Sequence, residues 1–420
     1  MDEHLIIGGV PAAAIARAVG TPVIVYDQGL MEAQLAAYMK GLASEAFATQ
    51  VLYASKAFIC PAMVRLAAEA GAGQDVVSGN ELAMALAGGM PADRIVFHGN
   101  NKTPDEMAAG LRAGVTMAVD SLAEAQALAA LSIGGRAIIR INPHIEAHTH
   151  RYDVTAGLDS KFGVAIDDVA AIERTVAALD AGGIEFMGLH AHIGSQIMET
   201  AGFVAAIEAL TGLARRLADD GIAVRWLDLG GGFAARYTAA DSPLDPSAVG
   251  RLIASAVSAS LARQGLSLSK VMIEPGRSIV AEAATELYTV GFTKRTPHKE
   301  YLFVDGGMAD NIRPALYQAR YQCLLDGKIG QPADHRYTVA GKCCESGDIL
   351  IEQADLPAAH PGDLLAVLST GAYGYSMASN YNLLARPAVV FAKDGRARLV
   401  IRREAYADLA RLAADQPLDL

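Results

Sequence analysis

The chain has 420 residues, of which 52% are hydrophobic and 19% are charged, and its formal net charge is -11. This length predicts one large α/β domain together with a smaller one. The acidic balance and the lack of a basic block argue against a nucleic-acid or anionic-membrane partner, so we expect a small-molecule ligand. No stretch approaches the roughly 18 uncharged apolar residues of a membrane span, and the first residues do not resemble a secretion signal, so a cytoplasmic protein is expected.

The four cysteines, Cys60, Cys323, Cys343 and Cys344, are too few and too irregularly spaced for a disulfide framework. The adjacent pair Cys343-Cys344 would form a disulfide only with strain. We therefore expect four free thiols in a reducing cytoplasm.

Up to residue 275, short β-rich runs alternate with Ala- and Leu-rich helical stretches. We expect eight strands, at residues 51–56, 75–78, 94–99, 117–120, 137–142, 186–194, 226–230 and 271–275. Parallel strands joined by helical crossovers, eight in number over about 250 residues, are typical of a closed (β/α)8 barrel of the TIM type. The fold class is thus α/β, with a barrel domain over residues 28–275.

Beyond residue 275 the pattern changes to strands without regular helices. We expect strands at residues 286–290, 301–304, 337–340, 364–368 and 388–391. The early run 23–26 precedes the first barrel helix and is available to this second sheet. The sequence therefore predicts a mostly β C-terminal domain formed by residues 1–27 and 276–420. A long irregular segment, 143–163, is expected to border the functional site.

Three features lie at the C-terminal ends of predicted barrel strands, where barrel enzymes build their sites. They are an amine, a glycine turn with bare N–H groups, and a carboxylate close to an arginine: Lys56, Gly230-Gly231-Gly232, and Glu274 with Arg277. Together these groups suit pyridoxal phosphate, which a protein holds through its aldehyde, phosphate and ring nitrogen. Taken singly, each has an ordinary alternative: a surface lysine, a tight turn, and a surface Glu–Arg pair.

His190 and His192 are two residues apart on a predicted strand and therefore share one face. This spacing suits two zinc ligands. We favour a stacking role for His192 on a cofactor ring, because the sequence shows no nearby acid or thiol set that completes a metal shell. A buried histidine of the core is the third interpretation, and no metal is expected.

Other candidates lie in the predicted β domain. The loop Cys344-Glu345-Ser346-Gly347-Asp348 joins a thiol with carboxylates, and a thiol near a cationic cofactor can donate a proton; an exposed turn is the alternative. Tyr373 offers a phosphate its hydroxyl, unless it only packs. Arg313 and Tyr317 are four apart on a predicted helix, which suits gripping a substrate carboxylate or, alternatively, a solvated face.

With these motifs in view, the chain resembles the diaminopimelate decarboxylases, a family of fold type III pyridoxal-phosphate enzymes. The resemblance covers nearly the whole chain. It rests on an ordered series of motifs: Tyr53-Ala-Ser-Lys56-Ala, Asp75-Val-Val-Ser78, His98-Gly-Asn-Asn-Lys102, Glu146-Ala-His-Thr-His150, Ser160-Lys-Phe-Gly163, His190-Ala-His192-Ile-Gly-Ser195-Gln, Gly230-Gly-Gly232, Glu274-Pro-Gly-Arg277, Asp305-Gly-Gly307, Arg313-Pro-Ala-Leu-Tyr317, Cys344-Glu-Ser-Gly-Asp348 and Gly371-Ala-Tyr-Gly374.

The resemblance implies a homodimer with shared active sites and a role for each matching residue. Lys56 would bind the cofactor aldehyde, His192 would stack on the ring, and Glu274 would face the pyridine nitrogen. The phosphate would be surrounded by Ser195, Gly231, Gly232, Gly276 and Tyr373, and Gly230 and Arg277 would also bind the cofactor. The distal end of the substrate would be bound by Arg277, Arg313, Tyr317, Glu345 and Tyr373, and Cys344 of the partner subunit would return the proton.

The expected activity is decarboxylation of meso-2,6-diaminopimelate to L-lysine and carbon dioxide, the last step of lysine biosynthesis. A related decarboxylase of another basic amino acid, such as ornithine, lysine or carboxynorspermidine, is the main alternative. The three side chains that would bind the distal end, Arg313, Tyr317 and Glu345, favour a substrate whose far end is itself an amino acid. A non-catalytic protein that carries pyridoxal phosphate would need neither the β domain nor Cys344 and Glu345.

Overall fold

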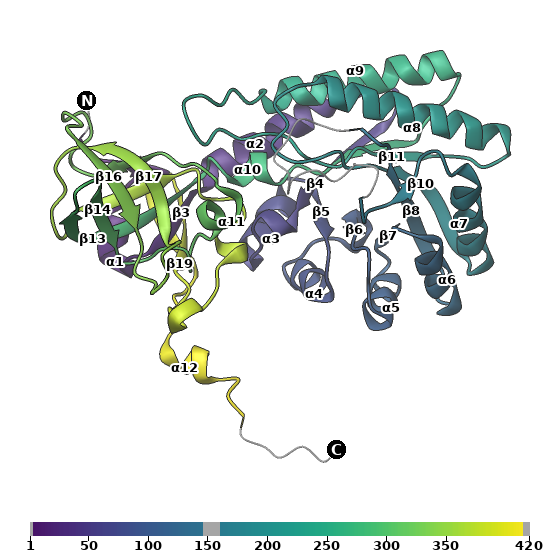
Figure 1. Cartoon of the computed structure of the whole chain (residues 1–420). Coiled ribbons are helices and arrows are strands. Elements are labelled where there is room, and N and C mark those ends of the chain that lie inside the picture. The colour runs from purple at the N-terminus through teal and green to yellow at the C-terminus, as the bar shows by residue number, and fades with distance from the viewer. Residues whose placement is uncertain (1–2, 146–159, 415–420) are drawn as a thin grey trace. The chain divides into compact units, whose positions relative to one another are not determined.

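The computed structural model describes residues 3–145 and 160–414 and divides the chain into two compact units (Figure 1). The barrel unit comprises Glu32–Ala235 and Ser242–Ile279, and the β unit comprises Met1–Met31, Arg236–Asp241 and Val280–Leu420. In the described part of the chain, every helix is too short or too polar to cross a membrane.

The barrel unit contains a closed ring of eight parallel strands, as the sequence predicts. The strands are β4 (Ala48–Ala54), β5 (Gly73–Val76), β6 (Ile95–Phe97), β7 (Thr116–Val119), β8 (Gly135–Asn142), β10 (Ile184–His190), β11 (Trp226–Asp228) and β12 (Lys270–Ile273). Pairing of β10 with β8 and of β12 with β4 closes the ring. A short strand, β9 (Val164–Ala165), adds to β8, and it follows the 143–163 segment, of which residues 146–159 lie outside the described ranges.

Helices precede or connect these strands and lie outside the ring (Figure 1). They are α2 (Gln28–Leu42), α3 (Pro61–Glu69), α4 (Gly79–Ala87), α5 (Pro104–Ala113), α6 (Leu122–Ala130), α7 (Val169–Ala181), α8 (Ala201–Asp219) and α9 (Pro246–Gln264). Five of them begin at a side chain that accepts a hydrogen bond from the backbone of the first turn, namely Ser78, Thr103, Ser121, Asp168 and Asp245. Each cap contributes about 1 kcal/mol and marks where a loop becomes a helix.

The barrel interior changes from apolar to polar along its axis. One layer consists of buried hydrophobic side chains from seven strands: Leu52, Val96, Ala118, Ile138, Met187, Trp226 and Met272. Because alternate residues of a strand share a face, the residues two positions further on point the same way. In six of the seven strands the residue two positions further on is Ala54, His98, Asp120, Arg140, Asp228 or Glu274. All of these except Ala54 are ionisable, so a charged layer lies above the apolar one, on the side of the C-terminal strand ends.

The β unit is built on a sheet with the order β17-β16-β14-β13-β3-β19-β20, and β18 links it to β15. The strands are β3 (Val23–Asp27), β13 (Ala284–Arg295), β14 (Glu300–Val304), β15 (Cys323–Leu325), β16 (His335–Ala340), β17 (Ile349–Leu356), β18 (Leu364–Leu368), β19 (Ala388–Lys393) and β20 (Arg396–Ile401). The expectation that residues 23–26 join this sheet is confirmed, because β3 pairs with both β13 and β19.

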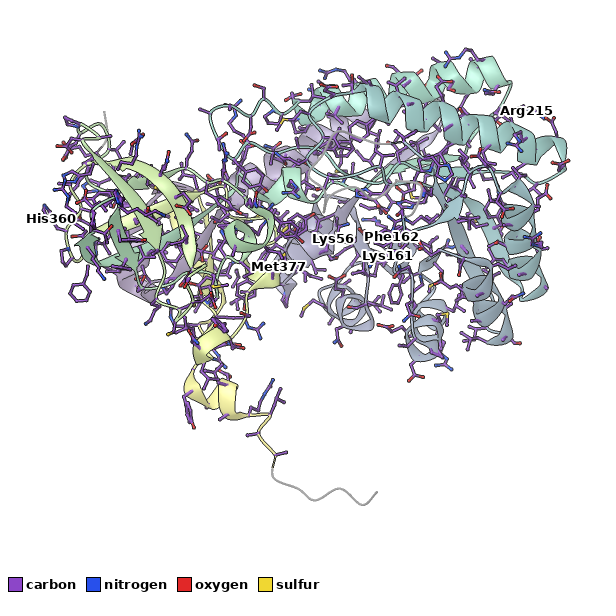
Figure 2. The ribbon with its side chains drawn as sticks, viewed as in Figure 1. Lys56, Lys161, Phe162, Arg215, His360 and Met377 are labelled. Carbon is purple, nitrogen blue, oxygen red and sulfur yellow. The ribbon has the colours of Figure 1, made fainter. Side chains whose placement is uncertain are left out.

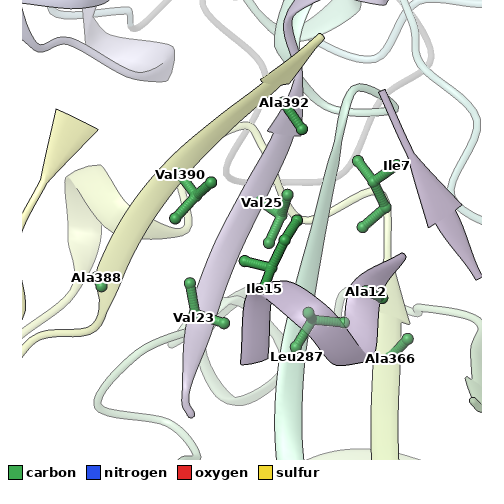
Figure 3. Packing of buried hydrophobic residues seen from close by; sticks show 10 residues of the cluster. All are labelled: Ile7, Ala12, Ile15, Val23, Val25, Leu287, Ala366, Ala388, Val390 and Ala392. Carbon is green, nitrogen blue, oxygen red and sulfur yellow. The ribbon is translucent and has the colours of Figure 1, made fainter. Parts of the chain in front are cut away.

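The core of the β unit covers one face of this sheet. Helix α1 (Ala12–Val19) and the small pair β1 (Ile6–Ile7) and β2 (Val10–Pro11) pack against β3, β13, β18 and β19 through ten buried residues (Figure 3). The remaining helices with four or more residues are α10 (Arg277–Val280), α11 (Arg313–Tyr317) and α12 (Tyr406–Ala410).

Candidate active site

Lys56 lies in a short 3-10 turn, Ser55–Ala57, directly after β4. Ser55 and Ala57 are buried while Lys56 is exposed, so the turn directs the lysine side chain away from the packed wall (Figure 2). The buried side chain of Gln74 on β5 fixes this turn by donating to Ser55 Oγ at 2.7 Å. The predicted amine is therefore present at the C-terminal mouth of the barrel.

Glu274 lies immediately after β12 and is buried between two histidines. Its Oε1 is 2.6 Å from His98 Nε2, and its Oε2 is 3.2 Å from His190 Nε2. The two imidazole rings are in edge-to-face contact with their centroids 4.7 Å apart. The alternative of a surface Glu–Arg pair is therefore wrong, since Glu274 is buried and its partners are histidines.

The electrostatics of this cluster favour a charged Glu274. Burial alone raises the pKa of a carboxyl group, but His98 and His190 lower the pKa of Glu274 well below its ordinary value. Burial lowers the pKa of His98, yet Glu274 and Asp75 outweigh that effect and raise it above its ordinary value. Burial lowers the pKa of His190 to about 4, against the opposing influence of Glu274.

Asp228, the last residue of β11, is the fourth member of the cluster. Burial raises its pKa well above the ordinary value, and the negative charge of Glu274 raises it further. Ligand atoms of His98, His190, Asp228 and Glu274 all lie within 4.8 Å of one another. The sequence interpretation that His190 lacks acidic neighbours for a metal shell is thus wrong, because residues from four separate strands converge here. His192 is not part of this set.

His192 follows β10 at the barrel mouth, where it is half-buried. The Gly231 amide donates to its Nδ1 at 3.2 Å, so Nε2 carries the proton of the neutral ring. Burial, together with the positive charges of Lys56 and Arg140, lowers the pKa of His192 well below its ordinary value. A neutral, oriented imidazole is suited to stacking on a flat cofactor ring.

The glycine run Gly230-Gly231-Gly232 is required by close backbone packing. A Cβ on Gly231 would lie 2.2 Å from Glu274 O, and one on Gly232 would lie 2.3 Å from Gly194 O. Gly230 and Gly232 also have positive φ angles of 61° and 101°, which favour glycine. Among the described residues, the amide groups of Gly232 and Gly276 donate no hydrogen bond within the protein, which leaves donors that suit a phosphate.

Arg277 and Ser195 contact each other. The Arg277 guanidinium donates to Ser195 Oγ from Nε at 3.2 Å and from Nη2 at 2.8 Å. The described end of the 143–163 segment contacts the charged layer of the barrel. The Phe162 ring centroid lies 4.3 Å from the guanidinium carbon of Arg140, and Gly163 N donates a hydrogen bond to Asp120 at 3.0 Å. The motif Glu146-Ala-His-Thr-His150 lies outside the described residues.

In the β unit, Arg313 is buried among phenol rings. Its Nη1 donates to Tyr237 Oη at 3.0 Å and to Tyr321 Oη at 3.1 Å, and the rings of Tyr317 and Tyr373 lie 5.9 and 5.7 Å from its guanidinium carbon. No carboxylate of the described residues forms an ion pair with it. The solvated-face alternative is therefore wrong for Arg313, which is only 6% exposed.

Cys344 and Glu345 lie in an exposed loop that a buried carboxylate anchors. Asp348 accepts hydrogen bonds from Met308 N at 2.6 Å and from Cys343 N at 2.7 Å. Cys344 N donates to Asn382 Oδ1 at 2.7 Å. Cys344 is exposed, whereas burial raises the pKa of its neighbour Cys343 to about 11. All four cysteines are free thiols, as expected.

The structure therefore groups the predicted residues in two sets. The barrel unit holds Lys56, His192, Ser195, Gly230, Gly231, Gly232, Glu274, Gly276 and Arg277, and the β unit holds Arg313, Tyr317, Cys344, Glu345 and Tyr373. Sequence reasoning assigned no role to the polar side chains that surround Glu274 inside the barrel: Asp75, His98, Arg140 and Asp228. Asp75 and Arg140 lie within strands, while Asp228 ends β11 and His98 follows β6, and such polar side chains beside buried apolar residues were the available signal.

Fold and site together define a barrel enzyme of the pyridoxal-phosphate type, because an amine, a neutral stacking imidazole, free amide donors and a buried carboxylate surround one barrel mouth. A model of the family described as pyridoxal-dependent decarboxylase, pyridoxal binding domain, matches residues 29–281. Diaminopimelate decarboxylases from Bacillus subtilis and Staphylococcus aureus are 46% and 42% identical to this chain, over 97% of it in both cases and over 95% and 97% of their own lengths.

Solved structures agree with these sequence matches. The diaminopimelate decarboxylase from M. jannaschii in co-complex with L-lysine has a TM-score of 0.91 and 30% identity, covering 99% of this chain and 97% of that one. The enzyme from Helicobacter pylori complexed with L-lysine has a TM-score of 0.87 and 32% identity, covering 95% and 98%. The chain belongs to the diaminopimelate decarboxylase family of the pyridoxal-dependent decarboxylases.

Proposed function

We propose that this protein removes carbon dioxide from meso-2,6-diaminopimelate and yields L-lysine, with pyridoxal 5'-phosphate as its cofactor. The observation that carries the choice of substrate is the environment of Arg313. A buried guanidinium whose partners are neutral phenols has an unmatched positive charge, which a carboxylate of the ligand would complete. A substrate with an amino-acid group at each end offers one carboxylate for this contact and another for the reaction.

The barrel residues fit the cofactor. Lys56 would bind its aldehyde, His192 would lie against its ring, and Glu274 would face its pyridine nitrogen. The phosphate would be held by Ser195, Gly231, Gly232 and Gly276, together with Tyr373 of the β unit, and Gly230 and Arg277 would also bind the cofactor. When bound, the cofactor supplies an electron sink for the pair of electrons left on the α-carbon by departing carbon dioxide.

The chain's own groups bind, orient and move a proton. The neutral ring of His192, fixed by Gly231 N, holds one orientation without adding a positive charge below the cofactor. Arg277, Arg313, Tyr317, Glu345 and Tyr373 bind the distal end of the substrate, which places the reacting carboxylate. Cys344 donates the proton that replaces carbon dioxide, and its thiol is exposed on an anchored loop.

The functional arrangement is a cytoplasmic homodimer whose active sites are shared. A barrel domain of residues 28–275 binds the cofactor, and a β domain of residues 1–27 and 276–420 brings Cys344 of the partner subunit to that site. Exposure of Cys344 and Glu345 supports this arrangement, because a donor thiol needs a reaction partner that the loop itself does not supply.

The test is release of carbon dioxide from a substrate panel containing meso-diaminopimelate, L-ornithine and D-lysine. We expect release from meso-diaminopimelate alone, by a yellow protein whose colour borohydride bleaches and whose cofactor is then found on Lys56 by peptide mapping. Comparable release from L-ornithine would contradict the substrate assignment. A colourless protein with unmodified Lys56, after incubation with pyridoxal phosphate, would contradict the cofactor assignment.

A further inference from the structure

The strongest unexplained feature of the barrel unit is the group of polar side chains around Glu274. Both oxygens of this carboxylate contact an imidazole nitrogen, at 2.6 Å for His98 and 3.2 Å for His190. Charged or titratable groups come from every strand around it: Lys56 after β4, Asp75 on β5, His98 after β6, Asp120 after β7, Arg140 on β8, His190 and His192 on or after β10, and Asp228 on β11.

Shared protons explain the spacing of this group better than a shared metal ion. Two ligands of one tetrahedral zinc ion lie roughly 3.3 Å apart, because each bond measures about 2.0 Å. His98 Nε2 and Glu274 Oε1 are 2.6 Å apart, the length of a charge-assisted hydrogen bond. The four polar side chains therefore form a hydrogen-bonded cluster in which the position of each proton decides the charge.

The contacts assign those protons. An anionic Glu274 is stable in a buried position only beside a cation, and His98 makes the short contact. A second cation next to it would be repelled, so His190 is a neutral ring that donates its Nε2 proton to Glu274 Oε2. Asp228 pairs with His190 across adjacent strands and accepts from Gly230 N at 3.0 Å. A second carboxylate beside Glu274 is stable only when it is protonated.

We propose that His98 and His190 are positioning residues that hold the Glu274 carboxylate in its charged form and in a single orientation, with Asp228 as the uncharged member of the cluster. This inference rests on the proposed function for its consequence. A carboxylate kept charged and fixed has lone pairs left to accept a hydrogen bond from a protonated pyridine nitrogen. The opposite directions of the pKa changes of His98 and His190 agree with one cation and one neutral donor.

The first experiment measures the imidazoles directly. The full chain, with histidine labelled by nitrogen-15 and no cofactor added, is examined by NMR near neutral pH, and signals are assigned with the His98→Gln and His190→Gln variants. We expect both ring nitrogens of His98 to be protonated and only one of His190. A neutral His98, or a doubly protonated His190, would overturn the charge assignment.

The second experiment compares these two variants as holoenzymes. Glutamine keeps an N–H donor close to the position of Nε2 but carries no charge. It should therefore replace His190, which acts as a neutral donor, but not His98, which acts as a cation. For His98→Gln we expect kcat to fall by about tenfold or more relative to the wild type, while KM stays within about twofold. The NMR signal of ring-labelled pyridoxal phosphate should show that its pyridine nitrogen is less protonated than in the wild type. For His190→Gln we expect both kinetic constants within about threefold and an unchanged ring signal.

Equal effects of the two variants, or a His98→Gln holoenzyme with the kcat and ring signal of the wild type, would overturn the proposal. A merely structural role would lower thermal stability without moving the ring-nitrogen signal. Wild-type protein that releases no carbon dioxide from meso-diaminopimelate would overturn the proposed function and with it the consequence for the cofactor ring. The imidazole spectrum is independent of that result and decides the charges of the cluster by itself.

Discussion

Arg313 illustrates how one buried side chain narrows the choice of substrate. Its guanidinium has two phenol partners, Tyr237 and Tyr321, and two further tyrosine rings beside it. Burial of an arginine without an acid is costly, and the interior of a protein normally supplies a counter-charge. Here a bound carboxylate would serve as that counter-charge, which explains why the tyrosines orient the guanidinium without neutralising it.

We predict that Arg313→Gln raises KM for meso-diaminopimelate by roughly 10- to 100-fold, the equivalent of one lost charge-assisted hydrogen-bonded contact. Affinity for pyridoxal phosphate should stay the same. Steady-state kinetics and a cofactor titration measure both quantities. Arg398→Gln is the matched control, since Arg398 is an exposed arginine of the same unit and should leave KM unchanged. An unaltered KM in Arg313→Gln would contradict the substrate contact.

The adjacent thiols Cys343 and Cys344 allow a second residue-scale prediction. Cys344→Ala should leave cofactor binding intact and lower kcat by about a hundredfold, because a general acid typically contributes that much. Cys343→Ala should lower kcat far less, since Cys343 is buried and its raised pKa of about 11 makes it a poor proton donor. The measurement is the rate of lysine formation, and an unchanged rate in Cys344→Ala would remove the thiol from the reaction.

At the scale of elements, Glu106 joins the starts of two barrel helices. Its Oε2 accepts from Thr103 N at 2.9 Å in the capping box of α5, and its Oε1 accepts from Gly79 N at 2.7 Å at the start of α4. The carboxylate thus satisfies N–H groups of both helix termini, where negative charge is also favoured by the helix dipoles.

We predict that Glu106→Ala lowers the free energy of unfolding by about 1 to 2 kcal/mol, because two capping contacts are lost. Asp105→Ala is the matched control, since Asp105 is an exposed acid of the same helical turn that makes neither contact, and its effect should stay within about 0.5 kcal/mol. Urea denaturation gives both values. Equal losses in the two variants would show that charge near the helix start, and not capping, is what matters.

The elements that sequence reasoning predicted share one property, which is a buried apolar run that ends at a turn residue. Seven of the eight barrel strands have it, and so does β3; the exception is β5, which is buried but contains Gln74 and Asp75. Five strands of the β unit were missed. Three of them, β1, β2 and β15, have only two or three residues. The longer β17 and β20 carry exposed polar residues: Glu352, Gln353 and Asp355 in β17, and Arg396 and Arg398 in β20. A strand at a sheet edge has no continuous apolar pattern to detect.

The residues of the site that close a barrel strand were predictable, and their contacts with other strands were not. Lys56, His192 and Glu274 could be found because each closes a strand, and strand ends are the known position of barrel sites. The contact of Glu274 with His98 and His190 depends on which strands meet across the barrel and on the bulge in β10 between Phe186 and Gly188. His98 and His190 are 176 and 84 residues away from Glu274 in the sequence, so the spacing of residues within a motif does not reveal these contacts.

At the scale of the whole molecule, the proposed sharing of active sites between two subunits predicts how mixed dimers behave. If Lys56 of one subunit works with Cys344 of the partner subunit, then Lys56→Ala and Cys344→Ala subunits together form hybrid dimers with one intact site. With random reassociation of equal amounts, about half of the dimers are hybrids and each hybrid has one intact site of two. The mixture should therefore regain about a quarter of the activity of the same amount of wild-type protein. Each variant alone is the control and should stay nearly inactive. Mixtures without any recovered activity would contradict sharing of the sites.

Two buried groups should change the stability in opposite directions over the same pH range, from about 4 to about 7. His190 has a pKa of about 4 in the folded barrel, below the ordinary value of 6.5. Between these values the unfolded chain binds the additional proton, so stability falls as the pH decreases, by an amount on the order of 3 kcal/mol. In the β unit, burial raises the pKa of Asp310 from 3.8 to about 7. There the folded state binds the additional proton, so stability falls as the pH increases, by on the order of 4 kcal/mol.

Asp310→Asn isolates the contribution of Asp310, because an amide cannot lose a proton while its oxygen can still accept from Gly307 N. We predict that this variant is more stable than the wild type above about pH 7 and gains nothing near pH 4, as measured by calorimetry between about pH 4 and 9. Asp394→Asn, at an exposed turn with φ of 52° that asparagine tolerates, is the control and should follow the wild-type curve. A gain that is constant across the pH range would show that packing, and not the buried charge of Asp310, limits the stability of the β unit.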